Sequence, residues 1–183
     1  DPAKALELGA KVYFQRCKIL GKEHPHTLSS LMSLATYYDQ IGNHAKALEL
    51  QEHAYRLRCK LSGEEHPETL AVLNNLALTY GKLGNSGKAL ELHETVYSLR
   101  CKILGKVHPS TLLSLNNMAA AHYKLGHYDK ALETGEKAYS LRCKVLGAEH
   151  PDTLVSLSNL AACYERLGNY AKALALCERV YRL

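Results

Sequence analysis

The sequence predicts an all-α protein, a solenoid of antiparallel helix pairs with about nine helices. The first observation behind this prediction is an internal repeat. The pattern Gly-x-x-His-Pro-x-Thr-Leu occurs four times at a constant offset of 42 residues, starting at Gly21, Gly63, Gly105 and Gly147. The second observation is the spacing of apolar residues, which recur every three or four positions between these junctions, as they do on one face of a helix. Self-similarity at such a period is typical of stacked units rather than of one closed globule.

Residues 1–20 are predicted to form a leading helix. Asp1 is a suitable N-cap residue, and Pro2 suits the first position of a helix. Apolar residues follow at helical spacing, and Gly21 is predicted to end the helix because the chain reversal there needs a residue that tolerates a positive φ.

Each repeat that follows contains two helical segments, called here its first and second helix. In the earliest repeat the first helix starts at His24-Pro25 and ends near Gly42, and the second helix starts near Asn43. Helices of about 17 residues joined by two to five residues form antiparallel hairpins. A lone hairpin cannot bury both of its apolar faces, so neighbouring hairpins must stack. We therefore expect one repeat array over residues 1–183, with a leading helix at 1–20 and repeats at 21–62, 63–104, 105–146 and 147–183, the last one truncated.

Composition and charge argue against several classes of protein. The chain has 183 residues, of which 46% are apolar and 22% are charged, as is ordinary for a folded protein. No apolar run approaches the roughly 20 residues of a membrane span, so no membrane partner is expected. The net charge of +5 is mild and acidic residues are interspersed with basic ones, which argues against a nucleic-acid partner. No signal peptide is evident, and the chain starts and stops within a repeat, so we expect it to be a piece of a longer array.

One histidine per repeat stands before a proline at the start of a first helix. Copies one repeat apart are expected to lie on the order of 15–20 Å from each other, given the diameter of a helix. This distance is too long for a shared metal ion, so no metal site is predicted. We expect these side chains to cap or pack the turn instead. The four histidines are His24, His66, His108 and His150.

The second helices carry further ladders at the same period. The leading helix and all second helices except the last contain Arg-Cys-Lys, with cysteines at positions 17, 59, 101 and 143. These thiols are too far apart to pair within one array, which indicates reduced cysteines in a cytoplasmic protein. The flanking cations are interpreted as favourable partners of the helix dipole in the last turn. A tyrosine ladder is predicted to lie in the core, and its members are Tyr13, Tyr55, Tyr97, Tyr139 and Tyr181.

A recurring segment carries a resemblance to a known family. The segment Leu76-Ala77-x-x-Tyr80-x-x-Leu83-Gly84-x-x-x-Lys88-Ala89-Leu90 resembles the tetratricopeptide repeat, with small residues where two helices approach closely. The 42-residue period resembles the longer variant found in kinesin light chains and in bacterial and fungal repeat arrays. The resemblance covers the whole chain. It implies a right-handed superhelix of helix pairs, with the first helices lining the concave side.

The resemblance also implies where a ligand would bind. In such families the residue before the Leu-Ala pair points into the groove, where an asparagine can donate to and accept from the main chain of a peptide. A basic border and positions that vary between repeats are predicted to complete the groove. The candidate groove residues are Asn74, Asn75, Asn116, Asn117, Asn159, Lys82, Lys124, Arg166, Leu78, Leu113 and Tyr123.

The sequence therefore predicts a non-enzymatic scaffold whose concave groove binds an extended or acidic peptide segment of another protein. No catalytic constellation and no cofactor site stands out from the repeat pattern. The alternative is a structural array that associates with itself through uncapped ends, since neither end of the chain has a polar outer face. This alternative predicts a homo-oligomer.

Overall fold

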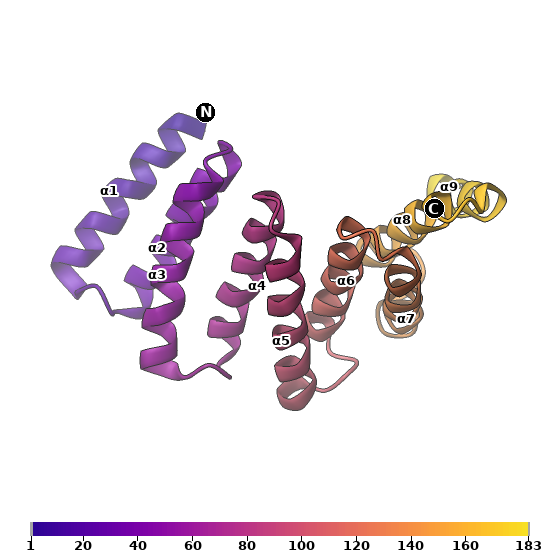
Figure 1. Ribbon diagram of the computed structural model, residues 1–183. Coiled ribbons are helices and arrows are strands. Elements are labelled where there is room, and N and C mark those ends of the chain that lie inside the picture. Colours follow the sequence, from indigo (N-terminus) through magenta and orange to yellow (C-terminus); the bar gives the residue numbers. More distant parts are fainter. Residues whose placement is uncertain (1, 183) are drawn as a thin grey trace. The chain divides into compact units, whose positions relative to one another are not determined.

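The computed structural model describes residues 2–182, and the side chains of residues 4–182. All regular structure in this range is α-helical, which confirms the predicted fold class (Figure 1). The predicted N-cap at Asp1 lies outside the described residues. Each repeat contributes a 16-residue first helix and a longer second helix, except that the final helix is shorter. The helices are α1 (Pro2–Leu20), α2 (Pro25–Gln40), α3 (His44–Ser62), α4 (Pro67–Lys82), α5 (Ser86–Leu104), α6 (Pro109–Lys124), α7 (Tyr128–Leu146), α8 (Pro151–Arg166) and α9 (Tyr170–Arg182).

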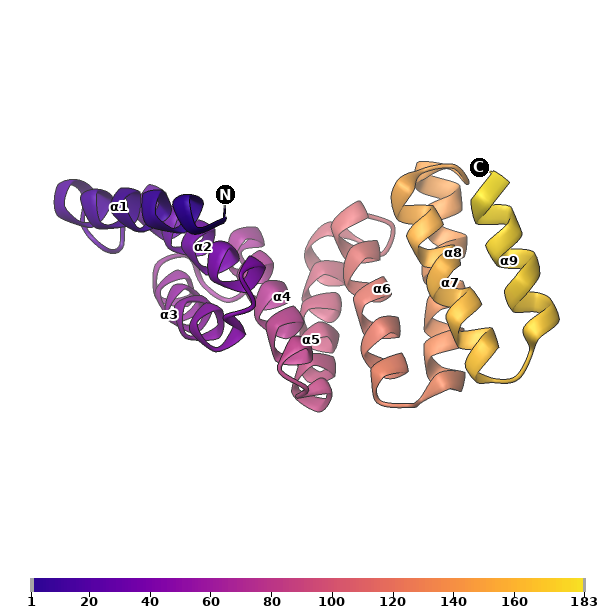
Figure 2. The same cartoon turned by 90° about the horizontal axis from the view of Figure 1, so that it is seen from above.

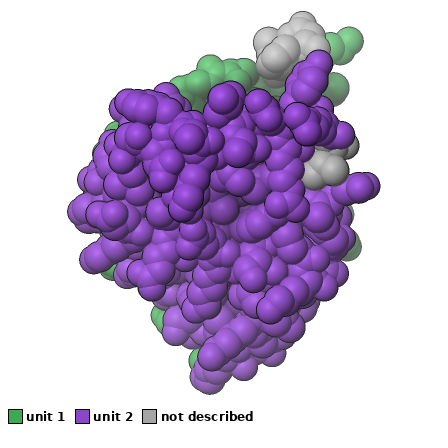
Figure 3. Space-filling model, turned by 90° about the vertical axis from the view of Figure 1, so that its right-hand side faces the viewer, with its two compact units in different colours: residues 1–92 green, residues 93–183 purple. Residues whose placement is uncertain are grey.

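The chain divides into two compact units, residues 1–92 and residues 93–183 (Figure 3). Unit 1 contains α1 to α4 and the start of α5, and unit 2 contains the rest of α5 and α6 to α9. Within each unit, consecutive helices pack against each other as antiparallel neighbours (Figure 2). The continuity of the array across the two units stays a prediction.

The repeated histidine caps the first helix of each repeat, as predicted. At α4, the Nδ1 atom of His66 accepts a hydrogen bond of 3.2 Å from the backbone N–H of Glu68. The same contact starts α2, α6 and α8. A capping acceptor satisfies one of the N–H groups that have no partner within the helix. The preceding junction passes through Gly63 at φ +84°, a conformation that side chains with a β-carbon rarely adopt.

Leucine and alanine form the packed interior. In α4, Leu70, Leu73 and Ala77 are buried, and Ala47 of α3 is fully buried where the second helix crosses its neighbours. An apolar stripe at helical spacing therefore faces both the partner helix and the next repeat. This arrangement accounts for the three-to-four-residue period of the sequence.

The tyrosine ladder is not part of this interior, so its predicted core role is wrong. The first four tyrosines are half-buried, and Tyr181 on α9 is 92% exposed. The pKa of Tyr13, Tyr55 and Tyr97 is raised to about 12. Burial is the main cause, and the hydrogen bond with the cysteine thiol four residues further on is the second. These rings cover the edge of the stripe, where part of each ring stays in contact with water.

The arginine of the Arg-Cys-Lys motif also differs from its prediction. Arg142 is only 1% exposed, and its Nη1 atom donates to the carbonyl oxygen of Asp152 at 2.6 Å and to Oγ of Ser156 at 2.8 Å. It lies before the last turn of α7, which contains Lys144 as its basic residue. Instead of balancing a helix dipole at the surface, this guanidinium joins one second helix to the first helix of the next repeat.

The same arginine contact recurs in both units. Arg16 reaches the carbonyl of His26 and the hydroxyl of Ser30, and Arg100 contacts the corresponding pair, 10 and 14 residues further on. Arg58 is the exception because the serine position holds Val72 there. Arg58 instead forms an ion pair with the carboxylate of Glu68. A buried guanidinium requires such partners, since an unpaired buried charge is strongly unfavourable.

One position of the second helices varies in size from repeat to repeat, and it is buried in α3, α5 and α7. It holds Gly9, Gln51, His93, Gly135 and Cys177 at the 42-residue period. His93 is 3% exposed, and burial, together with the positive charges of Arg100 and Lys124, lowers its pKa to about 4. The imidazole is therefore neutral in the folded protein at neutral pH.

Removal of the Arg142 guanidinium is expected to destabilise the fold. The variant Arg142→Leu leaves the carbonyl of Asp152 and the hydroxyl of Ser156 without their charged donor, which should cost about 3 kcal/mol of unfolding free energy. Urea unfolding followed by circular dichroism measures this loss. The control Lys144→Leu changes an exposed cation on the same helix and should cost less than about 0.5 kcal/mol. Equal losses in the two variants would contradict the role given to Arg142.

Acid is expected to destabilise the protein through His93. Its folded pKa of about 4 lies below the usual value of 6.5, so the unfolded chain binds a proton that the folded chain excludes. This contribution is complete above pH 6.5 and is lost as the pH falls to about 4, with a total on the order of 3 kcal/mol. Urea unfolding at pH 7.5 and 4.5 measures how much unfolding free energy is lost on acidification, and the variant His93→Gln should lose less than the wild-type chain. Glutamine is chosen because it occupies the equivalent position 51. The same acid dependence in both proteins would exclude His93 as its source.

Candidate functional site

The exposed side of the first helices in unit 2 brings together most of the predicted groove residues. On α6, Leu113 and Lys124 are exposed while Asn117 and Tyr123 are half-buried, and on α8 Arg166 is exposed. This side of the two helices is called here the α6/α8 face. The remaining residues of this face are Ala120, Val155, Asn159 and Ala162.

Asn116 lies next to this face but is occupied by neighbouring side chains. It is 6% exposed, and its Oδ1 atom accepts hydrogen bonds from Oγ of Ser156 at 3.0 Å and from Nδ2 of Asn159 at 3.4 Å. Ser156 is the same hydroxyl that accepts from Arg142. Asn116 therefore connects two repeats, and so little of it reaches solvent that it offers no surface to a ligand. The corresponding Asn74 of unit 1 is equally buried.

Aromatic and cationic side chains meet at the carboxyl ends of α6 and α8. Nε of Arg166 donates to the hydroxyl of Tyr123 at 3.1 Å, and its guanidinium carbon lies 6.0 Å from the centre of that ring. Tyr128 packs edge-on against Tyr123 with 5.4 Å between the ring centres. The pKa of Arg166 is raised, mainly by its hydrogen bond to the hydroxyl of Tyr123 and secondly by the electrostatic interaction between the two groups. The tyrosine thus holds the guanidinium in place while leaving it charged and exposed.

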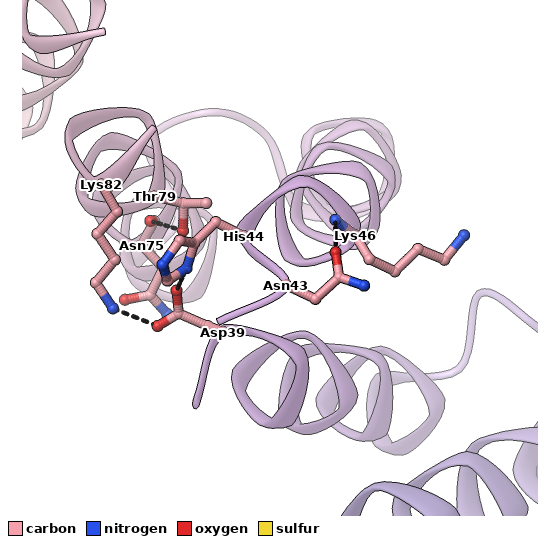
Figure 4. A network of polar contacts seen from close by, with 7 residues as sticks. All are labelled: Asp39, Asn43, His44, Lys46, Asn75, Thr79 and Lys82. Atoms are coloured by element: carbon pink, nitrogen blue, oxygen red, sulfur yellow. Dashed lines mark hydrogen bonds and ion pairs between the residues drawn. The ribbon is translucent and has the colours of Figure 1, made fainter. Parts of the chain in front are cut away.

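The corresponding end of α2 and α4 in unit 1 has a different chemistry (Figure 4). There the carboxylate of Asp39 accepts from Nδ1 of His44 at 2.7 Å and from Nζ of Lys82. Burial acts to raise the pKa of Asp39, but the hydrogen bonds from Lys82 and then His44 outweigh it, so the pKa is lowered. Lys82 was predicted to be part of a basic border, yet its charge is balanced by this carboxylate.

Asn75 and Leu78 are the other unit 1 residues of the predicted groove. Leu78 is exposed, and Asn75 is half-buried and borders a shallow depression together with Ser29 and Met32. Buried Arg58 and its exposed partner Glu68 also border this depression. The first-helix side of unit 1 therefore presents amide, hydroxyl and apolar groups beside paired charges, rather than free cations.

The described residues offer little support for other kinds of site. Within residues 2–182 no group of three or more histidine, cysteine, aspartate or glutamate side chains is arranged to hold a metal ion. All six cysteines are free thiols, and Cys163 is the buried one. No helix in the described part of the chain has both the length and the apolar character needed to cross a membrane.

Sequence comparison identifies the repeat. Tetratricopeptide repeat models match residues 27–68 and, in two overlapping segments, residues 88–144 and 110–183. A search of curated proteins found no match. Proteins with this repeat are in general scaffolds for protein interaction.

Solved structures give the same result over the full chain. Two structures of a Podosopora anserina putative kinesin light chain with nearly identical TPR-like repeats share 34% of the residues, one of them a single-residue variant. The variant superimposes with a TM-score of 0.84 over 99% of this chain and 85% of its own. BtubC (BKLC) from P. vanneervenii is 25% identical, with a TM-score of 0.83 over 100% of this chain and 72% of its own. Since the repeat models match more than half of the sequence and the similarity spans the whole chain, the chain belongs to the tetratricopeptide repeat family.

Proposed function

We propose that the chain is a non-enzymatic scaffold whose α6/α8 face binds an extended, acidic peptide segment of another protein. The proposal rests on the exposure of two cations and on the groups that surround them. Lys124 and Arg166 are exposed on this face, and neither has a carboxylate partner within hydrogen-bonding distance among the described residues. An acidic side chain of a ligand would supply the missing counter-charge, and a guanidinium can bind a carboxylate through two hydrogen bonds.

Amide groups in the middle of the same two helices suit a peptide main chain. Asn117 and Asn159 lie in the middle of the face, and both are half-buried, so each retains surface toward solvent. A carboxamide carries donors and an acceptor, which matches the alternating groups of an extended backbone. Leu113 and Val155 add exposed apolar surface at the amino ends of the two helices.

The distribution of charge favours unit 2 as the binding unit. Residues 93–183 contain twelve lysines and arginines against eight aspartates and glutamates, whereas residues 1–92 contain eleven against ten. The positive field of unit 2 would attract an acidic segment at long range. In unit 1, the ion pair of Asp39 and Lys82 removes the corresponding attraction.

Binding of acidic peptides should depend on the cations of the α6/α8 face. Fluorescein-labelled, eight-residue peptides of glutamate, serine and one aliphatic residue provide the probe, and fluorescence anisotropy measures the dissociation constant. The double variant Lys124→Glu, Arg166→Glu should weaken binding at least about tenfold, because it places like charges opposite the ligand. The double variant Asn117→Ala, Asn159→Ala should weaken binding without unfolding the protein.

A matched control separates specific contacts from net charge. The variant Lys137→Glu, Lys144→Glu makes the same charge change at exposed positions of α7, away from the face, and should retain most of the affinity. If this control lost as much affinity as the Lys124, Arg166 variant, the binding would reflect overall charge alone. If none of the peptides bound to the wild-type chain, the proposal would be wrong.

Exposed apolar side chains on α9 favour self-association as a second candidate function. Leu174 is 62% exposed and Tyr181 is 92% exposed, whereas Leu132 and Tyr139 at the same repeat positions of α7 are half-buried. Helix α7 packs against α8 of the next repeat, and Arg179 of α9 lies over the ring of Tyr139. We therefore propose that α9 pairs with α9 of another copy, so that the exposed apolar side chains of the two copies cover each other.

Self-association should appear as a mass that rises with concentration. Light scattering coupled to size exclusion, with reductant present, should give a mass above 20.3 kDa at high concentration for the wild-type chain. The variant Leu174→Lys, Tyr181→Lys should stay at 20.3 kDa, because charged side chains oppose burial of this surface. The control Leu8→Lys, at an exposed apolar residue of α1, should behave like wild type. A constant monomer mass for the wild-type chain would exclude this candidate.

A further inference from the structure

The turn between α6 and α7 contains two histidines at positions where the other repeats hold a tyrosine and an asparagine. In the repeat of residues 105–146 these positions hold His122 and His127. Both replacements introduce a side chain that can change its charge between about pH 5 and pH 8. The equivalent residues of the other repeats are Tyr38, Tyr80 and Tyr164, and Asn43, Asn85 and Asn169.

The tyrosine and the asparagine of the other turns hold two helices together. At the α8–α9 turn, the hydroxyl of Tyr164 donates to Oε1 of Glu136 on α7 at 2.7 Å. Oδ1 of Asn169 accepts from the backbone N–H of Lys172 at 3.3 Å and so caps α9. The equivalent residues make the same pair of contacts at the α4–α5 turn of unit 1. Neither side chain titrates between pH 5 and pH 8.

Among the residues that the structure describes, neither histidine reproduces these bonds. His122 is only 8% exposed, and its Nδ1 atom is buried without a hydrogen-bond partner. His127 is the N-cap residue of α7, yet its side chain makes no capping hydrogen bond. The backbone N–H of His127 donates to the carbonyl oxygen of His122 at 3.0 Å, and the two ring centres lie 6.0 Å apart. The turn therefore places two titratable rings side by side.

The surroundings of the two rings disfavour a positive charge. Burial is the main cause that lowers the pKa of His122, and the carboxylate of Glu94 on α5 opposes this shift. The neighbouring His127 and Lys130 lower the pKa of His122 further. A charge on His127 would also stand at the amino end of α7, where it opposes the helix dipole. Glu94 and Asp129, in the first turn of α7, are exposed, so water weakens their attraction for a charged ring.

We propose that the α6–α7 turn is an acid-sensitive switch, which is closed at neutral pH and opens locally in mild acid. Protonation of both His122 and His127 places two like charges close together in the closed turn. In the open turn both rings are in water, where each charge is well solvated. The open form therefore binds more protons than the closed form. The closed form is favoured above the usual histidine pKa of about 6.5 and is weakened as the pH falls below it.

Hydrogen exchange followed by mass spectrometry measures the opening of each turn in the whole chain. The protection of residues 121–131 is compared at pH 7.5 and pH 5.0, after correction for the pH dependence of intrinsic exchange. The opening equilibrium should increase at least about fivefold, because one excluded proton on a group with a usual pKa of about 6.5 can raise it up to roughly thirtyfold. Residues 79–89 and 163–173, where the turn holds tyrosine and asparagine, should change less than about twofold.

Two substitutions restore the residues of the other repeats. His122→Tyr introduces the tyrosine of position 80, with Glu94 at the place of Glu52, and His127→Asn introduces the asparagine of position 85. Each single substitution should remove part of the acid response, and the double variant should make residues 121–131 behave like residues 163–173. The control His26→Ser removes an exposed histidine of α2 and introduces the residue of position 110, so it should keep the response. Circular dichroism at pH 7.5 establishes that each variant is folded.

Three results would overturn the proposal. The first is equal corrected protection of residues 121–131 at both pH values in the wild-type chain. The second is an acid response that the folded double variant retains, because the response would then belong to other groups such as His93. The third is a gain of protection in acid, which would mean that Glu94 binds the protonated His122 in the closed turn.

Discussion

The buried arginine of α3, α5 and α7 is the contact on which the packing of successive repeats depends. A guanidinium removed from water must find acceptors, and here it finds them in the first helix of the next repeat. The acceptors are a backbone carbonyl and a serine hydroxyl, so the contact fixes both the distance and the rotation of the two helices. In unit 2 the network extends from Arg142 through Ser156 to Asn116, which spans α7, α8 and α6. Where Val72 replaces the serine, the carboxylate of Glu68 takes its place.

Most buried positions hold the same residue in every repeat, so the few that vary account for differences in packing between repeats. Leu28, Leu70 and Leu112 are equivalent, equally buried and identical, because each fills the same space between two helices. The position of Gly135 and His93 instead changes in volume and polarity, and the opposite helix does not always compensate. Tyr37 fills the space over Gly9, whereas Leu160 approaches Gly135 and a small pocket remains beside it, lined in part by Cys163. Variation inside a repeat interface can thus alter the binding surface without changing the helices that form it.

The two units use equivalent positions for opposite electrostatic results. Lys82 and Arg166 occupy the same place at the end of a first helix, and each contacts the residue 43 positions earlier. In unit 1 that residue is Asp39, so the charge is neutralised. In unit 2 it is Tyr123, whose ring and hydroxyl hold the guanidinium without cancelling its charge. Two faces with the same backbone therefore differ in the ligand charge that they would attract.

The sequence by itself determined the helices, their order and their junctions. Helical period, the histidine caps and the glycine turns act over a few residues, so each can be recognised along the chain. Only the tertiary structure decided that Arg142 is buried, that Asn116 is occupied while Asn117 keeps surface toward solvent, and that a small pocket remains beside Gly135. The contacts responsible join residues 14 to 40 positions apart. The recurrence of serine 14 residues after arginine was visible in the sequence, but a helical period alone does not reveal which side chains of successive repeats meet, because that depends on how one helix packs against the next.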